Sequence, residues 1–189
     1  MSDTVVRPVD DAVWDDLTTV FSTPGDPPGC WCQWFKVPRS RFDELSRADR
    51  AERLHEQVRT GSPGVLAWID GEPAGWAAVE PYTAYTTLAR SPITKRLDGD
   101  PTDPWAVTCF VVRAEFRRQG VARSLLDGAV AHARAQGADV IEGYPVDPEV
   151  RPSISTAERY HGTVSLFRDG GFDVVRRPSA IRAIMRRTL

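Results

Sequence analysis

The apolar positions near the N-terminus predict one strand followed by two helices. A short strand is predicted over 4–10, and a helix follows over 11–21, where apolar residues recur close to helical spacing. A second helix is predicted to begin at Ser46, which forms a capping-box-like pair with Asp49, and to end at Gly61.

Two strand-like runs, GVLAWID and PAGWAAVE, surround the pair Asp70-Gly71 and predict a β-hairpin. The stretch 22–40 is dense in proline and glycine and is predicted to be a loop, although it contains an aromatic-rich segment. The stretch 81–104 mixes tyrosine and basic residues with turn formers and has no clear period. We expect it to be a long loop with room for one helical turn.

The clearest pattern lies in the second half of the chain. A nearly unbroken apolar run over 105–112 predicts a strand that is buried on both faces at the centre of a sheet. A helix with one apolar face follows over 121–133 and ends near Gly137, and a second buried strand is predicted over 138–146. This order defines a parallel βαβ unit. A short helix over 162–171 and two terminal strands complete the prediction.

The composition is that of a soluble protein with one domain, spanning 1–189. A chain of 189 residues with 41% apolar and 26% charged positions can bury a sizeable core. Its net charge of -2 creates no positive field, so we expect no nucleic-acid partner. Three cysteines and a start without a signal-like pattern predict a cytoplasmic protein with reduced thiols. No run approaches the ~18 apolar residues of a membrane span, so no membrane partner is expected.

An arginine-rich turn connects the central strand to the following helix. The sequence RRQGVA, over 117–122, leaves backbone N–H groups unpaired at the positive end of the helix. Gly120 permits close backbone approach, and Arg118 and Arg123 add charged donors, which together suit a pyrophosphate. The alternative is an arginine cluster that only solvates a turn. Neither G-x-G-x-x-G nor G-x-x-x-x-G-K-[ST] occurs there, which argues against a dinucleotide fold and a P-loop.

This turn resembles the acetyl-CoA motif [RQ]-x-x-G-x-[GA] of the GCN5-related N-acetyltransferases, the GNAT family. Arg117, Gly120 and Ala122 match the motif. The opening VVRPVDDAVWDDL is similar to the first strand and helix of the family, and SLFRDGGFDVV is similar to its last helix. The resemblance covers most of the chain. It implies an α/β fold with a mixed, mostly antiparallel twisted sheet, a central parallel βαβ unit and flanking helices.

The resemblance also implies acetyl-CoA as the co-substrate. The backbone around Phe110 to Val112 would pair with pantetheine, and N–H groups from Arg118 to Arg123 would hold the pyrophosphate. The sheet would splay between its fourth and fifth strands to admit the ligand. The residues implied to bind the co-substrate are Phe110, Val111, Val112, Arg117, Arg118, Gln119, Gly120, Val121, Ala122, Arg123 and Phe167.

Two carboxylates are the candidates for a catalytic base. Acetyl transfer to an amine needs a neutral nucleophile, a donor for the thioester oxygen and an acid for the leaving thiolate. The tyrosine acid of the family falls at Phe167, which cannot donate a proton. Glu142, within an apolar strand, is the first candidate for the base, with exposure or an arginine partner as the alternative. Glu80 is the second, with a salt bridge as the alternative. Tyr160 and His161 could donate a proton or simply cover a helix start.

The segment CWCQWF, over 30–35, is the most unusual local feature. Two cysteines with one residue between them cannot form a four-ligand zinc site, so no metal is expected. Its aromatic residues predict a hydrophobic plug that also forms a wall for the acceptor. Cys109 is expected to be a buried, unreactive side chain. The candidate acceptor-binding residues are Trp31, Trp34, Phe35 and Tyr144.

These observations predict an acetyl-CoA-dependent N-acetyltransferase that transfers acetyl directly to an amine of a small molecule or a protein. Two alternatives stay open. One is a transferase for a longer acyl-CoA, and the other is an acyl-CoA-binding regulatory or interaction module without turnover. The terminal strands could pair or exchange between two copies, so a homodimer is also considered.

Overall fold

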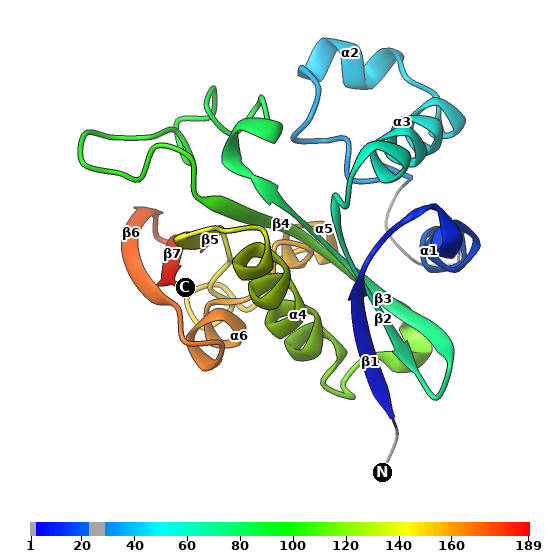
Figure 1. Ribbon diagram of the computed structural model, residues 1–189. Helices are drawn as coiled ribbons and strands as arrows, with labels where there is room; N and C mark the ends of the chain where they lie inside the picture. The colour runs from blue at the N-terminus through cyan, green and yellow to red at the C-terminus, as the bar shows by residue number, and fades with distance from the viewer. Residues whose placement is uncertain (1–2, 23–28) are drawn as a thin grey trace.

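The computed structural model describes residues 3–22 and 29–189, and these form one twisted sheet with helices on both faces (Figure 1). The described strands lie in the order β1-β2-β3-β4-β5-β7-β6. Neighbouring strands are antiparallel except for β4 and β5, which are parallel. This arrangement confirms the predicted fold class. The strands are β1 Thr4–Pro8, β2 Gly64–Ile69, β3 Glu72–Pro81, β4 Trp105–Val112, β5 Val140–Gly143, β6 Asp173–Ser179 and β7 Arg182–Thr188.

Helices cover both faces of the sheet. Helix α4 (Val121–Ala135) packs on one face, and α1 (Trp14–Ser22) and α3 (Arg47–Thr60) lie against the other (Figure 1). The shorter helical segments are η1 Asp11–Val13, α2 Arg39–Glu44, η2 Tyr82–Ala84, η3 Ala114–Phe116, α5 Thr156–Arg159 and α6 Val164–Asp169. No helix of the described chain is both long and apolar enough to span a membrane.

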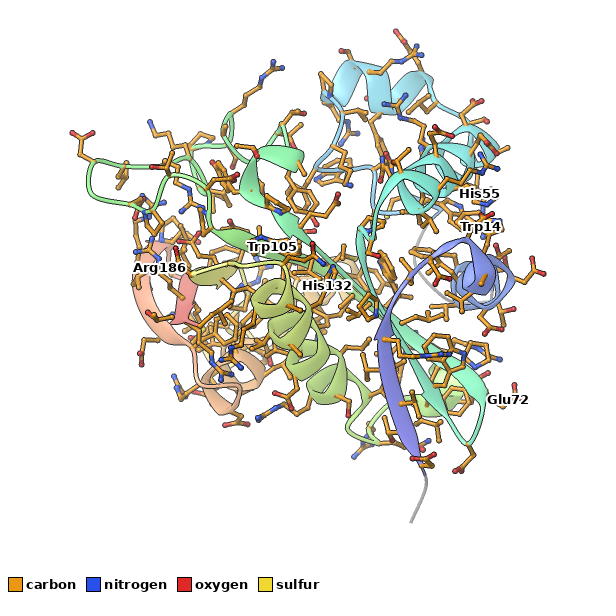
Figure 2. All side chains as sticks on the ribbon, viewed as in Figure 1. Trp14, His55, Glu72, Trp105, His132 and Arg186 are labelled. Carbon is orange, nitrogen blue, oxygen red and sulfur yellow. The ribbon has the colours of Figure 1, made fainter. Side chains whose placement is uncertain are left out.

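The predicted apolar face of α4 is buried against the sheet. Its buried side chains recur every three or four residues, as the sequence indicates. The Trp105 ring, at the start of β4, makes an edge-to-face contact with His132 of α4, with ring centroids 5.2 Å apart (Figure 2). The buried apolar residues of α4 are Val121, Leu125, Leu126, Ala129, Val130 and Ala133.

Several element boundaries follow from local sequence signals. The capping box of Ser46 and Asp49 is present at the start of α3. Asp70 and Gly71 both adopt positive φ, at 50° and 85°, and form the turn between β2 and β3. Gly137, with φ at 81°, follows the end of α4. The predictions of these boundaries are confirmed.

The parallel pairing of β4 and β5 is short. Residues Trp105–Val107 lie opposite Ile141–Gly143, and the named strands pair no further. Strand β4 also carries a bulge at Thr108, because the residues on either side of Thr108 pair with consecutive residues of β3. The two strands therefore diverge immediately after the bulge.

An aromatic ring lies where the strands diverge. A Cβ atom at Gly143, the last residue of β5, would overlap the ring of Phe167 in α6. Phe167 is fully buried and makes edge contacts with Phe110 of β4 and with Phe172, at centroid distances of 5.9 and 5.0 Å. Because Gly143 has no side chain, the Phe167 ring of α6 can pack against the end of β5 and close one side of the gap between β4 and β5.

Some local predictions differ from the structure. Helix α2 was not predicted; it begins at Arg39, at the end of the loop predicted over 22–40, of which 23–28 lie outside the described residues. Strand β5 covers only four residues of the strand predicted over 138–146, because the chain turns away and Val146 forms bridges to other segments. The helical turn α5 was not predicted, since its four residues carry no periodic pattern.

We expect Gly143→Ala to lower the free energy of unfolding by about 1–3 kcal/mol, because the new methyl group overlaps the Phe167 ring. Gly61→Ala is the matched control, since its backbone is extended and its nearest neighbour, the Gln57 carbonyl oxygen, is 3.9 Å from the added Cβ. Urea denaturation measures both. Equal stability of the two variants would contradict the packing described for β5 and α6.

Candidate functional site

The turn between β4 and α4 presents backbone donors to solvent. Arg118 and Gly120 have left-handed backbone, with φ at 62° and 83°. Within the described chain, the N–H groups of 118–122 make no backbone hydrogen bond, and they lie at the positive end of a 15-residue helix. A Cβ at Gly120 would meet no atom within 4 Å, so open space lies beside the turn. This geometry fits a pyrophosphate group.

The arginines of the turn have different surroundings. Arg117 donates through Nε to the Val112 carbonyl at 3.1 Å. Arg123 forms an ion pair with Asp127, with Nε 2.9 Å from a carboxylate oxygen. Arg118 is exposed at the centre of the turn. The charge of Arg123 is therefore already balanced, whereas that of Arg118 lies next to the open space.

Beyond the bulge, residues 160–161 contact the edge of β4. The N–H of Phe110 donates to the Tyr160 carbonyl at 2.6 Å, and His161 Nδ1 lies 3.0 Å from the Thr108 carbonyl oxygen. An extended ligand that pairs with β4 here must replace Tyr160 at Phe110. The edge thus fits pantetheine only if this contact gives way.

A cavity of about 370 Å³ opens beside the same part of β4. One wall comes from the loop before α2 and is aromatic and sulfur-rich. Another part of the lining comes from residues 158–161 and from the start of β7, and it carries the charged groups. The lining residues are Cys30, Cys32, Trp34, Phe35, Thr108, Cys109, Glu158, Tyr160, His161 and Arg182.

His161 provides a neutral imidazole in this cavity. A carbonyl oxygen only accepts hydrogen bonds, so the contact with Thr108 assigns the proton to Nδ1 and leaves the lone pair on Nε2. Burial, followed by the nearby Arg182 guanidinium, lowers the pKa of His161 to about 4. The ring lies against Phe35, with centroids 5.5 Å apart. His161 is therefore uncharged near pH 7 and can accept a hydrogen bond through Nε2.

Glu142 is fully buried and paired with two arginines. Its carboxylate accepts from Arg96 Nη1 at 2.9 Å and from Arg186 Nε at 2.7 Å. Arg186, on β7 and labelled in Figure 2, also donates to Asp100 at 2.8 Å. The Tyr144 hydroxyl donates to the Glu142 carboxylate at 3.4 Å. Glu142 is thus paired with arginine, which was the alternative to a catalytic role in the sequence analysis. It does not line the cavity.

Glu80 forms an ion pair with Lys36. Their side chains are only 19% and 9% exposed, and Lys36 Nζ also donates to Gln57 at 2.9 Å. Glu80 lies opposite Ala106 in the sheet and does not line the cavity. These surroundings correspond to the salt-bridge alternative.

The aromatic residues of the loop before α2 have separate positions. Trp34 and Phe35 line the cavity. Trp31 is buried and stacks on Phe21, with ring centroids 4.7 Å apart, so it is part of the core plug. Tyr144 is 4% exposed and packs in a separate buried cluster. The cavity lining therefore contains only two of the four side chains that were expected to bind the acceptor.

Phe167, expected to contact the co-substrate, lies in the core with no exposed surface, because its ring packs against Gly143 at one face of the divergence of β4 and β5. The sequence reasoning also missed Glu158 and Arg182, which line the cavity from distant parts of the chain. No local motif distinguishes these two residues from surface charges. Within the described residues, no group of three or more histidine, cysteine or acidic side chains is placed to hold a metal ion.

The fold places a turn with backbone donors at a helix N-terminus and a cavity beside the same strand. The model of the acetyltransferase (GNAT) family matches residues 28–163, so the chain belongs to the GNAT family. This match confirms the resemblance expected from the sequence. A comparison with curated proteins finds no match.

Solved structures of similar fold share little sequence identity with the chain. The protein yncA of Salmonella typhimurium, described with its cofactor acetyl-CoA, has a TM-score of 0.55 and 15% identity, over 98% of this chain and 94% of that one. The paia N-acetyltransferase of Thermoplasma acidophilum, described in complex with coenzyme A, has a TM-score of 0.54 and 12% identity, over 99% of both chains. A ribosomal-protein-alanine N-acetyltransferase of Brucella melitensis has a TM-score of 0.55 and 16% identity, over 98% and 99%.

We expect the NMR titration of His161 to have a midpoint at about 4, below the ordinary value of 6.5. Arg182→Gln should raise that midpoint, because it removes a nearby cation. The pKa of His161 is lower in the folded chain than in the unfolded chain. As pH falls from 6.5 towards 4, the unfolded chain therefore binds the proton first. Protonation of His161 thus lowers the free energy of unfolding over this range. An unshifted midpoint would contradict the buried position of the ring.

Proposed function

We propose that the protein is an acetyl-CoA-dependent N-acetyltransferase that moves acetyl directly to an amine of a small molecule or a protein. The observation that carries the proposal is the divergence of β4 and β5, with an anion-binding turn at the end of β4 and a cavity beside its bulge. Membership of the GNAT family supports acetyl transfer as the chemistry.

The turn and the edge of β4 would hold acetyl-CoA, which supplies the acetyl group as a thioester. The N–H groups of 118–122 and the exposed Arg118 suit its pyrophosphate. The peptide groups of Phe110 and Val112 suit its pantetheine, once Tyr160 and Arg117 release them. The descriptions of yncA with acetyl-CoA and of the paia enzyme with coenzyme A support the same ligand here.

His161 is our candidate for the group that receives the acceptor amine. A neutral imidazole with its lone pair on Nε2 accepts a hydrogen bond from an amine and orients the nitrogen lone pair for attack. With a pKa of about 4 it is a weak base, so its main contribution is positioning. Glu142 and Glu80, the carboxylates favoured by the sequence, are ion-paired with cationic partners and do not line the cavity.

The cavity walls limit the acceptor class. Trp34 and Phe35 suit an apolar or cationic body, and Glu158 and Arg182 add one charge of each sign to the lining. We therefore propose an amine that carries an apolar or aromatic group. The phenylalanine at position 167 favours a second candidate, an acyl-CoA-binding module without turnover, and release of the CoA thiol in the presence of amines distinguishes the two.

Gly120→Glu should reduce the affinity for acetyl-CoA by at least about 10²-fold, because it places bulk and negative charge where the pyrophosphate would bind. Gly137→Glu is the matched control. Gly137 has a similar positive φ of 81° and equally open surroundings, but it follows the opposite end of α4. Calorimetry measures the affinity of both variants for acetyl-CoA. The same affinity in both would show that the turn does not bind the pyrophosphate.

His161→Asn should lower kcat/KM for the amine by roughly 10²-fold while the affinity for acetyl-CoA stays unchanged. The amide nitrogen of asparagine can still donate to the Thr108 carbonyl, but the acceptor at Nε2 is lost. His161→Gln, which extends an amide towards the Nε2 position, should recover part of the rate. Equal loss in both variants would indicate that His161 has only a structural role.

A further inference from the structure

All three cysteines of the chain line one cavity. Cys30 and Cys32 come from the loop before α2, and Cys109 comes from β4, directly after the bulge. The two parts of the chain are far apart in sequence. Packing as small hydrophobic side chains does not by itself require all three thiols to lie at one cavity.

The sulfur of Cys32 accepts a hydrogen bond and lies in the same packed cluster as a second cysteine. Trp76 donates through its indole Nε1–H to Cys32 Sγ at 3.2 Å, and Cys109 packs against the buried cluster that contains Cys32. Both Trp31 and Cys32 have left-handed backbone, with φ at 47° and 54°, which is uncommon for residues other than glycine. The loop therefore adopts a strained conformation, in which this sulfur accepts from Trp76.

The three thiols differ in acidity in a way that fits the hydrogen bonds. Donation from Cys109 is the main cause that lowers the pKa of Cys32, and donation from Trp76 and the charge of Lys36 act in the same direction. The contact with Cys32, together with burial, raises the pKa of Cys109 well above its ordinary value. Burial raises the pKa of Cys30 to about 12. Cys32 is thus the most easily ionised of the three, with Cys109 as its proton-bearing neighbour.

We propose that Cys32 and Cys109 form a peroxide-reactive thiol pair, in which Cys32 is oxidised by hydrogen peroxide and Cys109 then closes a reversible disulfide bond. The cavity gives a small polar oxidant access to the Cys32 sulfur. The proposal assigns a modification site that acetyl transfer does not need.

The chemistry balances in two steps. The Cys32 thiolate attacks one peroxide oxygen, so that an S–O bond forms, the O–O bond breaks and hydroxide leaves; the sulfur is oxidised by two electrons to a sulfenic acid. The Cys109 sulfur then attacks the Cys32 sulfur, the S–O bond breaks, and water leaves with the Cys109 proton. A dithiol reductant reverses the bond by thiol–disulfide exchange.

The disulfide would join the loop before α2 to β4 next to Thr108, whose carbonyl holds His161. The walls of the cavity would then be joined by a covalent bond at the same sulfur that accepts from the Trp76 N–H. A change in acceptor binding rests on the proposed function. The formation of the bond does not, because it requires only the cavity and the two thiols.

The test is to treat the purified protein with a small excess of hydrogen peroxide, block the remaining thiols with iodoacetamide, and analyse tryptic peptides by mass spectrometry. We expect a bridge between the peptide that contains Cys30 and Cys32 and the peptide that contains Cys109, lost after dithiothreitol. No lysine or arginine separates Cys30 from Cys32, so variants assign the bridge. Cys30→Ser should keep it, and Cys32→Ser and Cys109→Ser should lose it.

Cys109→Ala and Cys32→Ala provide second variants at these partly buried positions, and circular dichroism checks the fold of each. In Cys109→Ala, dimedone should trap a sulfenic acid at Cys32. The proposal is overturned if the thiols stay reduced, if Cys30 forms the bridge, or if only disulfides between two chains appear. Because the readout is a covalent bond, it is independent of acetyl transfer, and an inactive enzyme would leave the result unchanged.

Discussion

The early end of the pairing between β4 and β5 is the constraint on which the rest of the site depends. A parallel pair continued beyond Val107 would satisfy the edge of β4 with β5 and leave neither a ligand edge nor a cavity. The pairing ends at Val107, where β4 has a bulge at Thr108, and at Gly143, whose missing side chain leaves room for the Phe167 ring. The Phe167 ring then closes one face of the divergence, and the cavity opens beside β4.

A buried ion-pair cluster connects β5 and β7 next to the site. Glu142 is taken out of water only because Arg96 and Arg186 surround its carboxylate. Removing one partner of such a group leaves an uncompensated charge, so the cluster fixes how β5, β7 and the preceding loop fit together. His161, in contrast, lies in the cavity as a neutral ring, and this difference separates a structural acid from a group able to receive an amine.

The sequence predicted those parts of the molecule that depend on neighbouring residues. The apolar face of α4, the hairpin turn at Asp70-Gly71 and the turn around Gly120 each follow from patterns within a few positions, and the structure contains all three. The partners of Glu142 could not be read in this way, because Arg96 and Arg186 lie 46 and 44 positions from it. An ion pair between residues so far apart produces no recognisable pattern in the sequence around either residue.

The same limit applies to the cavity. The loop over 30–35 was identified by its composition, but its relation to Cys109 and Arg182 depends on how the sheet folds. The contact of Tyr160 with Phe110 was equally hidden, since it joins a short helical turn to the central strand. Sequence patterns therefore predicted the turn before α4 better than the surroundings of the candidate catalytic residues.

The most direct test of the central claim is hydrogen exchange of the backbone amides with and without acetyl-CoA. If the divergence of β4 and β5 holds this ligand, the amides of 118–122, which have no backbone partner in the described chain, should exchange more slowly when it is present. Residues 160–161 should change their exchange as they leave the edge of β4. Unchanged exchange over both segments at a saturating concentration of acetyl-CoA would contradict the account.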